Sequence, residues 1–327
     1  MAVIDHIMRK FGSYFLIISG IFAVFAYLTW FPSPLEAPYK LVKTWGEKGT
    51  ANGQFIEPTG IVVSEEHVFV SDARNSRIQV FDFDGHFQYE IGTSGSEVER
   101  LQRPMNLGIH DAKLYVTDYW SDQLKIYSLD GNFINSIGKS GTGSGEFNSP
   151  GGVAIDSKSN LYIADFLNQR IQKLTPQGKF MRQWGHTGQT GIQSGQFNYP
   201  TDTAIDADDN LYVADGYNDR VQVINPDGEI IHKWGGPFAM NIFGPFNGWF
   251  ATVTGIAIGP EGNVFVADFY NDRIQKFSSG GIFLNVFGIK STGPTHTAIA
   301  VTVARDGSVF VADYANNQIQ KWVQGEK

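Results

Sequence analysis

Asn106 and Asp202 are the side chains in this sequence best suited to hold an ion or a water molecule. Each interrupts a column of small residues two positions after a recurring proline; the column otherwise reads Gly60, Gly152, Gly255 and Ala300. Thr59, Thr201 and Thr254 directly precede members of this column. Calcium takes six to eight oxygen ligands, more than one carboxylate and one amide supply. We therefore expect a solvated polar site here, with no metal.

The histidines offer no second catalytic constellation. They are His6, His67, His86, His110, His186, His232 and His296, and only His296 is placed to reach the polar column. The chain has no cysteine, which excludes a thiolate nucleophile, a Cys-ligated zinc and any disulfide. G-x-S-x-G, H-E-x-x-H and P-loop motifs are absent. We predict no catalytic residue and no cofactor. A metal-dependent lyase or hydrolase acting through Asp202 and Asn106 stays open as an alternative.

A signature that recurs six times determines where these residues lie. It reads, for example, IADFLNQRIQKL at 163 and VADFYNDRIQKF at 266, and its aspartates are Asp72, Asp118, Asp165, Asp215, Asp268 and Asp313. Apolar or alternating runs such as LYIAD, IQKL and FMRQWG, separated by Asp-Gly turns, predict four short β-strands in each unit. Six such units without a helical stretch favour an all-β, six-bladed propeller over residues 39–327.

The two ends of this repeat array are expected to meet. The sixth unit stops at Trp322 without an outer strand, whereas LVKTWG at 41–46 matches FMRQWG at 180–185 position for position. An N-terminal strand that completes the sixth blade would remove the open sheet edge of a linear array.

The recurring pattern resembles the NHL repeat. Its elements are P-x-G-[IV]-A-[IV]-D, then [LV]-[YF]-[VI]-A-D-x-x-N-x-R-[IV]-Q, then W-G, and they extend from Leu41 to Trp322. The resemblance implies a platform that recognises proteins or RNA; a related group includes peptidyl-hydroxyglycine amidating lyases. A zinc site like that of the lyases would need several histidines at equivalent inner-strand positions, and this sequence has none there. The fold alone does not choose the function.

Four blades pair the recurring aspartate with an arginine five residues later, which predicts structural ion pairs within the blades. These arginines are Arg77, Arg170, Arg220 and Arg273. The second and sixth blades have Gln123 and Gln318 instead, so Asp118 and Asp313 need another donor.

Large side chains occupy the loops between the second and third strands, where NHL repeats usually have small polar residues. They are Tyr119, Trp120, Phe166, Leu167, Tyr217, Phe269, Tyr270 and Tyr314. The long link at 235–255 opens on the same face and adds Phe238, Phe243, Phe246, Trp249 and Phe250. Exposed apolar clusters usually mark interaction sites, so we predict that this rim binds a protein. The alternative is that the rings cover one another and plug the channel mouth.

The N-terminal region differs from the rest of the chain. Residues 11–31 form 21 consecutive residues without a charge, directly after Arg9 and Lys10. A helix of this length spans a hydrocarbon core of about 30 Å. We predict a cytoplasmic tail at 1–10, a transmembrane helix at 11–31 and a Pro-rich linker at 32–38. A cleaved signal peptide is the alternative.

These features favour a non-catalytic recognition or scaffold module, such as an accessory subunit of a membrane complex. It would be a single-pass protein of the cytoplasmic membrane, N-terminus inside, with its propeller in the periplasm or outside the cell. The formal net charge of −8 argues against a nucleic-acid partner. We expect the partner to be another subunit or an extrinsic domain. Because the closing strand enters from the face opposite the rim, we expect the rim to point away from the bilayer or sideways.

Overall fold

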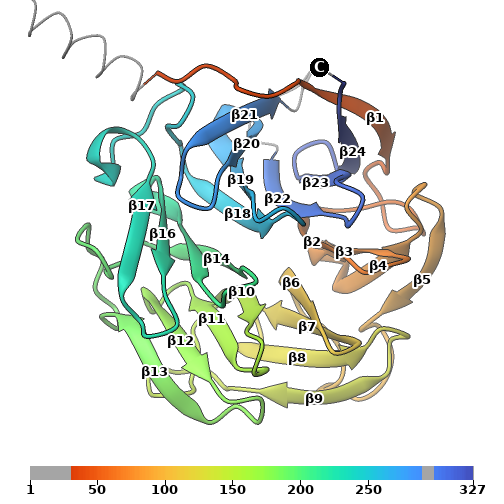
Figure 1. Ribbon diagram of the computed structural model, residues 1–327. Coiled ribbons are helices and arrows are strands. Elements are labelled where there is room, and N and C mark those ends of the chain that lie inside the picture. Colours follow the sequence, from red (N-terminus) through yellow and green to blue (C-terminus); the bar gives the residue numbers. More distant parts are fainter. Residues whose placement is uncertain (1–30, 289–297, 327) are drawn as a thin grey trace, which may run out of the picture.

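The computed structural model describes residues 31–288 and 298–326, which contain six four-stranded antiparallel sheets arranged around a central channel (Figure 1). Blade one has β2 (Pro58–Val63), β3 (Val68–Asp72), β4 (Arg77–Phe81) and β5 (Phe87–Ile91); blade two β6 (Pro104–His110), β7 (Lys113–Asp118), β8 (Gln123–Ser128) and β9 (Phe133–Ile137); blade three β10 (Pro150–Ile155), β11 (Leu161–Asp165), β12 (Arg170–Leu174) and β13 (Phe180–Gly185). Blade four has β14 (Pro200–Ile205), β15 (Leu211–Asp215), β16 (Arg220–Ile224) and β17 (Ile230–Trp234); blade five β18 (Val253–Ile258), β19 (Val264–Asp268), β20 (Arg273–Phe277) and β21 (Phe283–Gly288); blade six β22 (Ala298–Val303), β23 (Val309–Asp313), β24 (Gln318–Gln324) and β1 (Tyr39–Trp45). The predicted six-bladed propeller is confirmed.

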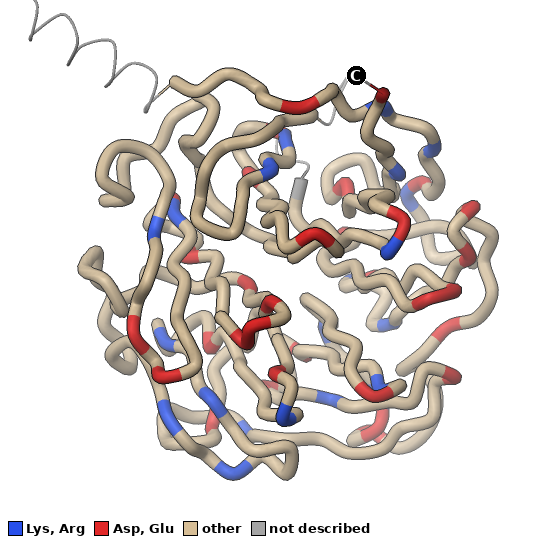
Figure 2. The backbone as a smooth tube through the Cα atoms, in the orientation of Figure 1, with Lys and Arg blue, Asp and Glu red and all other residues tan. Residues whose placement is uncertain are grey.

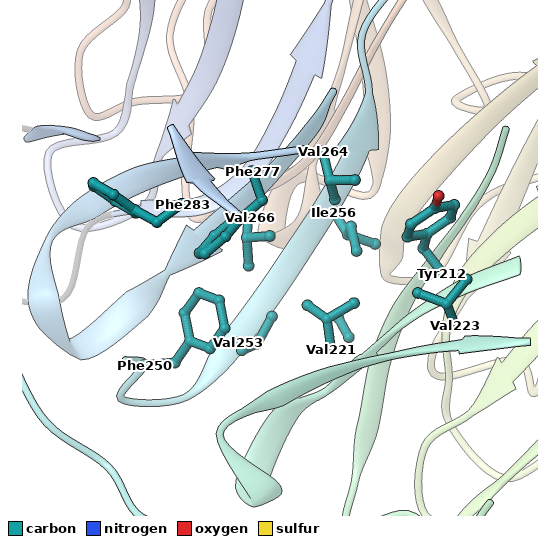
Figure 3. Packing of buried hydrophobic residues seen from close by; sticks show 11 residues of the cluster. Tyr212, Val221, Val223, Phe250, Val253, Ile256, Val264, Val266, Phe277 and Phe283 are labelled. Carbon is teal, nitrogen blue, oxygen red and sulfur yellow. The ribbon is translucent and has the colours of Figure 1, made fainter. Parts of the chain in front are cut away.

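The hydrophobic core lies between neighbouring blades. The second strands are buried along nearly their whole length, as LYIAD in β11 is, because blades cover both of their faces. The outer strands alternate or face solvent, as FMRQWG in β13 does. One cluster joins Val221 and Val223 of blade four to Val264 and Val266 of blade five (Figure 3). The same arrangement recurs around the ring, so the blades hold one another by burial of apolar surface.

Glycine in the inner strands permits this close approach. A Cβ atom at Gly60 would lie 2.1 Å from the carbonyl oxygen of Met105, and one at Gly255 would lie 2.8 Å from the Cα atom of Ala300. Both contacts join neighbouring inner strands, so the small residues of this column are required by the crowding at the channel.

The N-terminal strand completes blade six, as predicted. β1 pairs antiparallel with β24, Tyr39 opposite Gln324 and Trp45 opposite Ile319. β1 and the end of β24 lie side by side at the edge of the ring in Figure 1.

The linker before β1 follows the outside of blade five. The Leu35 backbone N–H donates to the carbonyl of Leu284 (2.8 Å), and Asn285 Nδ2 donates to the carbonyl of Ala37 (2.6 Å). Lys276 Nζ lies 2.8 Å from the carboxylate of Glu36. The linker is therefore folded onto the propeller along most of its length.

The predicted transmembrane helix at 11–31 lies outside the described residues except for Phe31. Within the part of the chain that the structure describes, no helix is long and apolar enough to cross a bilayer. Phe31 contacts the link between β17 and β18, which opens on the rim face. β1 enters from the face opposite the rim, as expected, because Tyr39 pairs with Gln324 at the end of β24. Residues 31–38 run back across blade five, so the linker begins on the rim side.

Candidate functional site

The rim loops are held by the recurring aspartates, all of which are fully buried. In blade four, Asp215 accepts hydrogen bonds from the backbone N–H of Asn198 (2.7 Å) and from Arg220 Nε (2.7 Å). Arg220 Nη2 in turn donates to the carbonyls of Gln193 and Gln196 in the incoming link. Equivalent ion pairs occur in blades one, three and five. The predicted pairs are confirmed, and they fix both loops that form the rim.

The two blades without this arginine use other donors, as expected. Lys125 Nζ lies 3.4 Å from Asp118 Oδ2 in blade two, and the same ammonium donates to the carbonyl of Arg100. Gln318 Nε2 donates to Asp313 Oδ2 (2.6 Å) in blade six.

The rim rings form contacts that run from blade to blade. Tyr119 contacts Phe166 (centroids 6.3 Å apart), Phe166 contacts Tyr199 (5.0 Å), and Tyr199 contacts Tyr217 (5.1 Å). On the other side of the mouth, Phe269 contacts Tyr270 (5.1 Å) and Tyr314 (6.2 Å). Six of the seven rings predicted in the rim loops therefore contact another ring, in keeping with the alternative that the rings cover one another. The outer members remain exposed: Trp120, Leu167, Tyr217 and Tyr270.

The residues predicted from the 235–255 link also include both exposed and buried side chains. Phe246 is exposed and Trp249 is half-buried, with their ring centroids 5.1 Å apart. Phe250 is fully buried against Phe277 (centroids 5.6 Å apart) and does not belong to a binding surface (Figure 3). It occupies the repeat position of Phe55, Phe147 and Phe197, each of which is also fully buried.

A cavity of about 220 Å³ opens at the rim mouth of the channel. Thr59, Asn106, Thr201 and Thr254 line it, as predicted, and so do Arg103, Met105, Tyr119, Gly151, Phe166 and Ile299. Thr59 Oγ1 donates to the carbonyl of Pro104 (3.0 Å), and Thr201 Oγ1 to that of Val253 (2.9 Å). These hydroxyls tie neighbouring inner strands together, so the cavity is less polar than the sequence predicted.

Asp202 does not line this cavity. Its carboxylate accepts hydrogen bonds from the backbone N–H groups of Thr203 (2.8 Å) and Ile256 (3.0 Å), the second of which belongs to the neighbouring blade. Burial raises the pKa of Asp202 to about 7. The carboxylate therefore joins two inner strands, and Asp202 does not line the cavity with Asn106, as the metal-dependent alternative expects.

Metal ligands do not gather elsewhere in residues 31–288 and 298–326, where no group of three His, Asp or Glu side chains is placed to hold an ion. His296 lies outside the described residues. His67 lines a larger hollow of about 960 Å³ that also contacts Glu65, Asp130 and Arg305. Its walls include turns between first and second strands in several blades, such as β2–β3 and β22–β23, so it opens on the face opposite the rim.

Sequence reasoning missed Arg103 and Tyr199. The guanidinium carbon of Arg103 lies 5.3 Å from the ring centroid of Trp120 and 5.7 Å from that of Tyr119. Arg103 Nη2 lies 3.3 Å from the carboxylate of Glu57, while its buried Nε has no hydrogen-bond partner. Both residues stand one position before the first residue of an inner strand. At this position other blades have the small residues Ser149 and Thr252, whereas Glu57, Arg103 and Tyr199 are large. This difference between repeats could have indicated them.

Comparison with known families supports this architecture. The NHL repeat model matches residues 55–81, 197–224 and 250–277, and a family described as a 6-bladed beta-propeller matches residues 96–183. The chain thus contains NHL repeats within a six-bladed β-propeller.

Curated relatives match over short segments. "Protein brain tumor" of Drosophila melanogaster is 39% identical over 61 residues, which are 18% of this chain and 6% of that protein. "B-box type zinc finger protein ncl-1" of Caenorhabditis elegans is 45% identical over 47 residues, 14% of this chain and 6% of that protein. The chain thus matches about 6% of the length of these relatives.

Solved propellers share the fold over nearly the whole described ring. A streptogramin B lyase structure has a TM-score of 0.60 at 16% identity and covers 88% of this chain and 98% of its own. The WD40 propeller domain of Doa1 has a TM-score of 0.61 at 12% identity, and the match covers 89% of this chain and 98% of that domain. A structural genomics protein from Bacteroides thetaiotaomicron has a TM-score of 0.66 at 15% identity, and the match covers 87% of this chain and 75% of that protein. Likeness at these identities concerns the fold alone.

Proposed function

We propose that this protein is a membrane-anchored NHL propeller that recognises a protein partner through its aromatic rim. The observation that carries the proposal is the ring of exposed side chains around the mouth cavity: Trp120, Leu167, Tyr217 and Tyr270. Tyr and Trp provide large contact areas at a small cost in side-chain entropy, and they are enriched in protein interfaces.

The buried ion pairs support this role because they hold the rim rigid before a partner arrives. Arg273, for example, donates to the carbonyls of Phe246 and Trp249, and Arg220 to that of Ala239. A preorganised surface loses less conformational entropy on binding. The partner is expected to insert an apolar side chain into the mouth cavity beside Tyr119 and Phe166, with Arg103 at its edge.

The anchoring part of the proposal rests on the sequence of residues 9–31. An uncharged segment after Arg9 and Lys10 favours an N-terminus inside and a propeller outside the cytoplasmic membrane. A non-catalytic subunit of a membrane complex fits this location. The negative net charge of the chain favours a protein over a nucleic acid at the rim.

The test is native purification of the full chain in mild detergent, with quantification of the chains that co-purify. A triple variant, Trp120→Ser, Tyr217→Ser and Tyr270→Ser, should lose its partner without losing stability, because the three side chains are exposed. The matched control changes three exposed apolar residues on outer strands, Ile134, Met181 and Ile231, to serine. Retention of every partner by the rim variant would overturn the proposal, as would equal loss in the control.

A further inference from the structure

The long link between β17 and β18 presents the two most exposed aromatic side chains of the described residues. Phe238 is 69% exposed and Phe243 is 73% exposed, and Met240 and Ile242 between them are also exposed. The chain carries no charge from Gly235 to Pro260, so the whole link is tan in Figure 2. Exposure of this kind is costly in water unless another apolar phase covers it.

The backbone of this link holds its apolar side chains outward. Phe238, Ala239 and Asn241 adopt positive φ angles of 60°, 49° and 57°, which are uncommon for residues other than glycine. The strained turn is fixed to blade four, because Arg220 Nη1 donates to the carbonyl of Ala239 (3.1 Å). The amide of Asn241, oriented to satisfy its hydrogen bonds, donates to Asp219 Oδ2 (3.1 Å). Strain maintained by the surrounding structure is typical of functional segments.

The linker from the N-terminal segment reaches the propeller at this same link. The ring of Phe31 lies 4.7 Å from that of Phe246, and Asn247 Nδ2 donates to the carbonyl of Pro32 (2.9 Å). A groove of about 690 Å³ runs between linker and link, lined in part by Leu35, Phe238 and Ile282.

These residues make one apolar surface at the edge of blades four and five. We name it the link patch: Leu35, Phe238, Met240, Ile242, Phe243 and Ile282, all exposed. Lys233 lies at its border, and among the described residues no Asp or Glu lines the groove.

We propose that the link patch inserts into the interface of a lipid bilayer. This inference rests on the membrane anchoring proposed above. Phe31 is the last residue of the predicted membrane helix at 11–31, so a helix that ends there would leave the bilayer beside the patch. Apolar side chains without charges suit the region between headgroups and acyl chains, and Lys233 suits anionic headgroups. The propeller then rests on its side at blades four and five, and the rim stays accessible along the membrane surface.

The chain has no cysteine, so a single cysteine placed in the full-length protein gives a unique labelling site. We would attach an environment-sensitive fluorophore to Phe243→Cys, Ala23→Cys or Met181→Cys. Each labelled protein would be reconstituted into vesicles of phosphatidylcholine and phosphatidylglycerol that contain spin-labelled lipids. Met181 is the matched control, an equally apolar exposed residue on an outer strand of blade three.

Lipid-borne quenching is expected at positions 23 and 243 and not at 181. Quenching at 23 without quenching at 243 would overturn insertion of the link patch and leave the anchoring intact. Quenching at neither position would overturn both. Protection of the label at 243 from lipid-borne quencher and from aqueous iodide would show that protein covers the patch, either residues 11–30 or a second chain, and would also overturn the lipid assignment.

Discussion

The ring of Phe31 stacks on the indole of Trp249, with centroids 5.8 Å apart and an interplanar angle of 24°. This contact joins residues more than two hundred positions apart and attaches the start of the linker to the rim side of the propeller. The aromatic contacts of Phe31 and the hydrogen bond from Asn247 Nδ2 to the carbonyl of Pro32 together hold the start of the linker there.

Changing Trp249 to serine should loosen the linker. The Glu36 carboxylate, now paired with Lys276, would then be more accessible to a glutamate-specific protease. We expect cleavage after Glu36 to become at least several-fold faster, measured by mass spectrometry over time. Trp120→Ser is the control, because it makes the same substitution on the rim without touching the linker. Equal cleavage rates in both variants would show that Trp249 does not hold the segment.

Asp202 should make the stability of the propeller pH-dependent. Its carboxyl has a pKa of about 7 in the folded protein, raised by burial from its ordinary value of 3.8. Between these values the unfolded chain has released a proton that the folded protein retains. The stabilisation is thus complete below pH 4 and is lost as the pH rises through 7, a change on the order of 4 kcal/mol.

Asp202→Asn removes this titration. The difference in unfolding free energy between wild type and variant, measured by urea denaturation at several pH values, should therefore fall as the pH rises from 4 to 7. If the unfolding free energies of wild type and variant differ by the same amount at every pH in this range, the raised pKa of Asp202 is contradicted.

The buried ion pair between Asp215 and Arg220 should contribute to the stability of blade four. Arg220→Met would leave the Asp215 carboxylate buried without its cation, which costs about 3–5 kcal/mol. The comparison is Arg74→Met, which removes an ion pair with Glu57 at the exposed rim and should leave the denaturation midpoint unchanged. A loss below about 1 kcal/mol in Arg220→Met would mean that the hydrogen bonds from Asn218 and Gln222 satisfy Asp215 alone.

Replacement by alanine should lower the stability of the protein at Phe250 but not at Phe243. Phe250→Ala creates a cavity beside Phe277 and should cost about 3–5 kcal/mol. Phe243→Ala removes an exposed ring from the same link and should leave the stability of the detergent-solubilised protein unchanged. Thermal unfolding of both variants checks this, and similar melting temperatures would contradict the assignment of Phe250 to the core.

The repeat explains why so much of the fold could be predicted from sequence. Each unit supplies the same strands and the same aspartate, so six copies define one blade and its neighbours. The missing outer strand of unit six, together with LVKTWG, predicted the pairing of β1 with β24 that the structure confirms.

Residues in the irregular link were harder to predict. Phe246, Trp249 and Phe250 look alike in composition, and only their packing separates them. A signal was present, however, because Phe250 precedes Asp268 by the same interval that separates Phe197 from Asp215. The position of the linker had no such signal, since contacts such as Asn247 with Pro32 join distant residues of unrelated pattern.

The pairing of Tyr39 with Gln324 affects how this chain must fold. β1 is synthesised before the first blade and β24 after the fifth, so blade six is assembled last. Contacts this distant along the chain slow folding. Meanwhile β1 is an unpaired strand that could join another chain, and its Lys40 and Lys43 carry the charges that discourage such pairing. The two lysines thus protect the chain during the interval when its ring is still open.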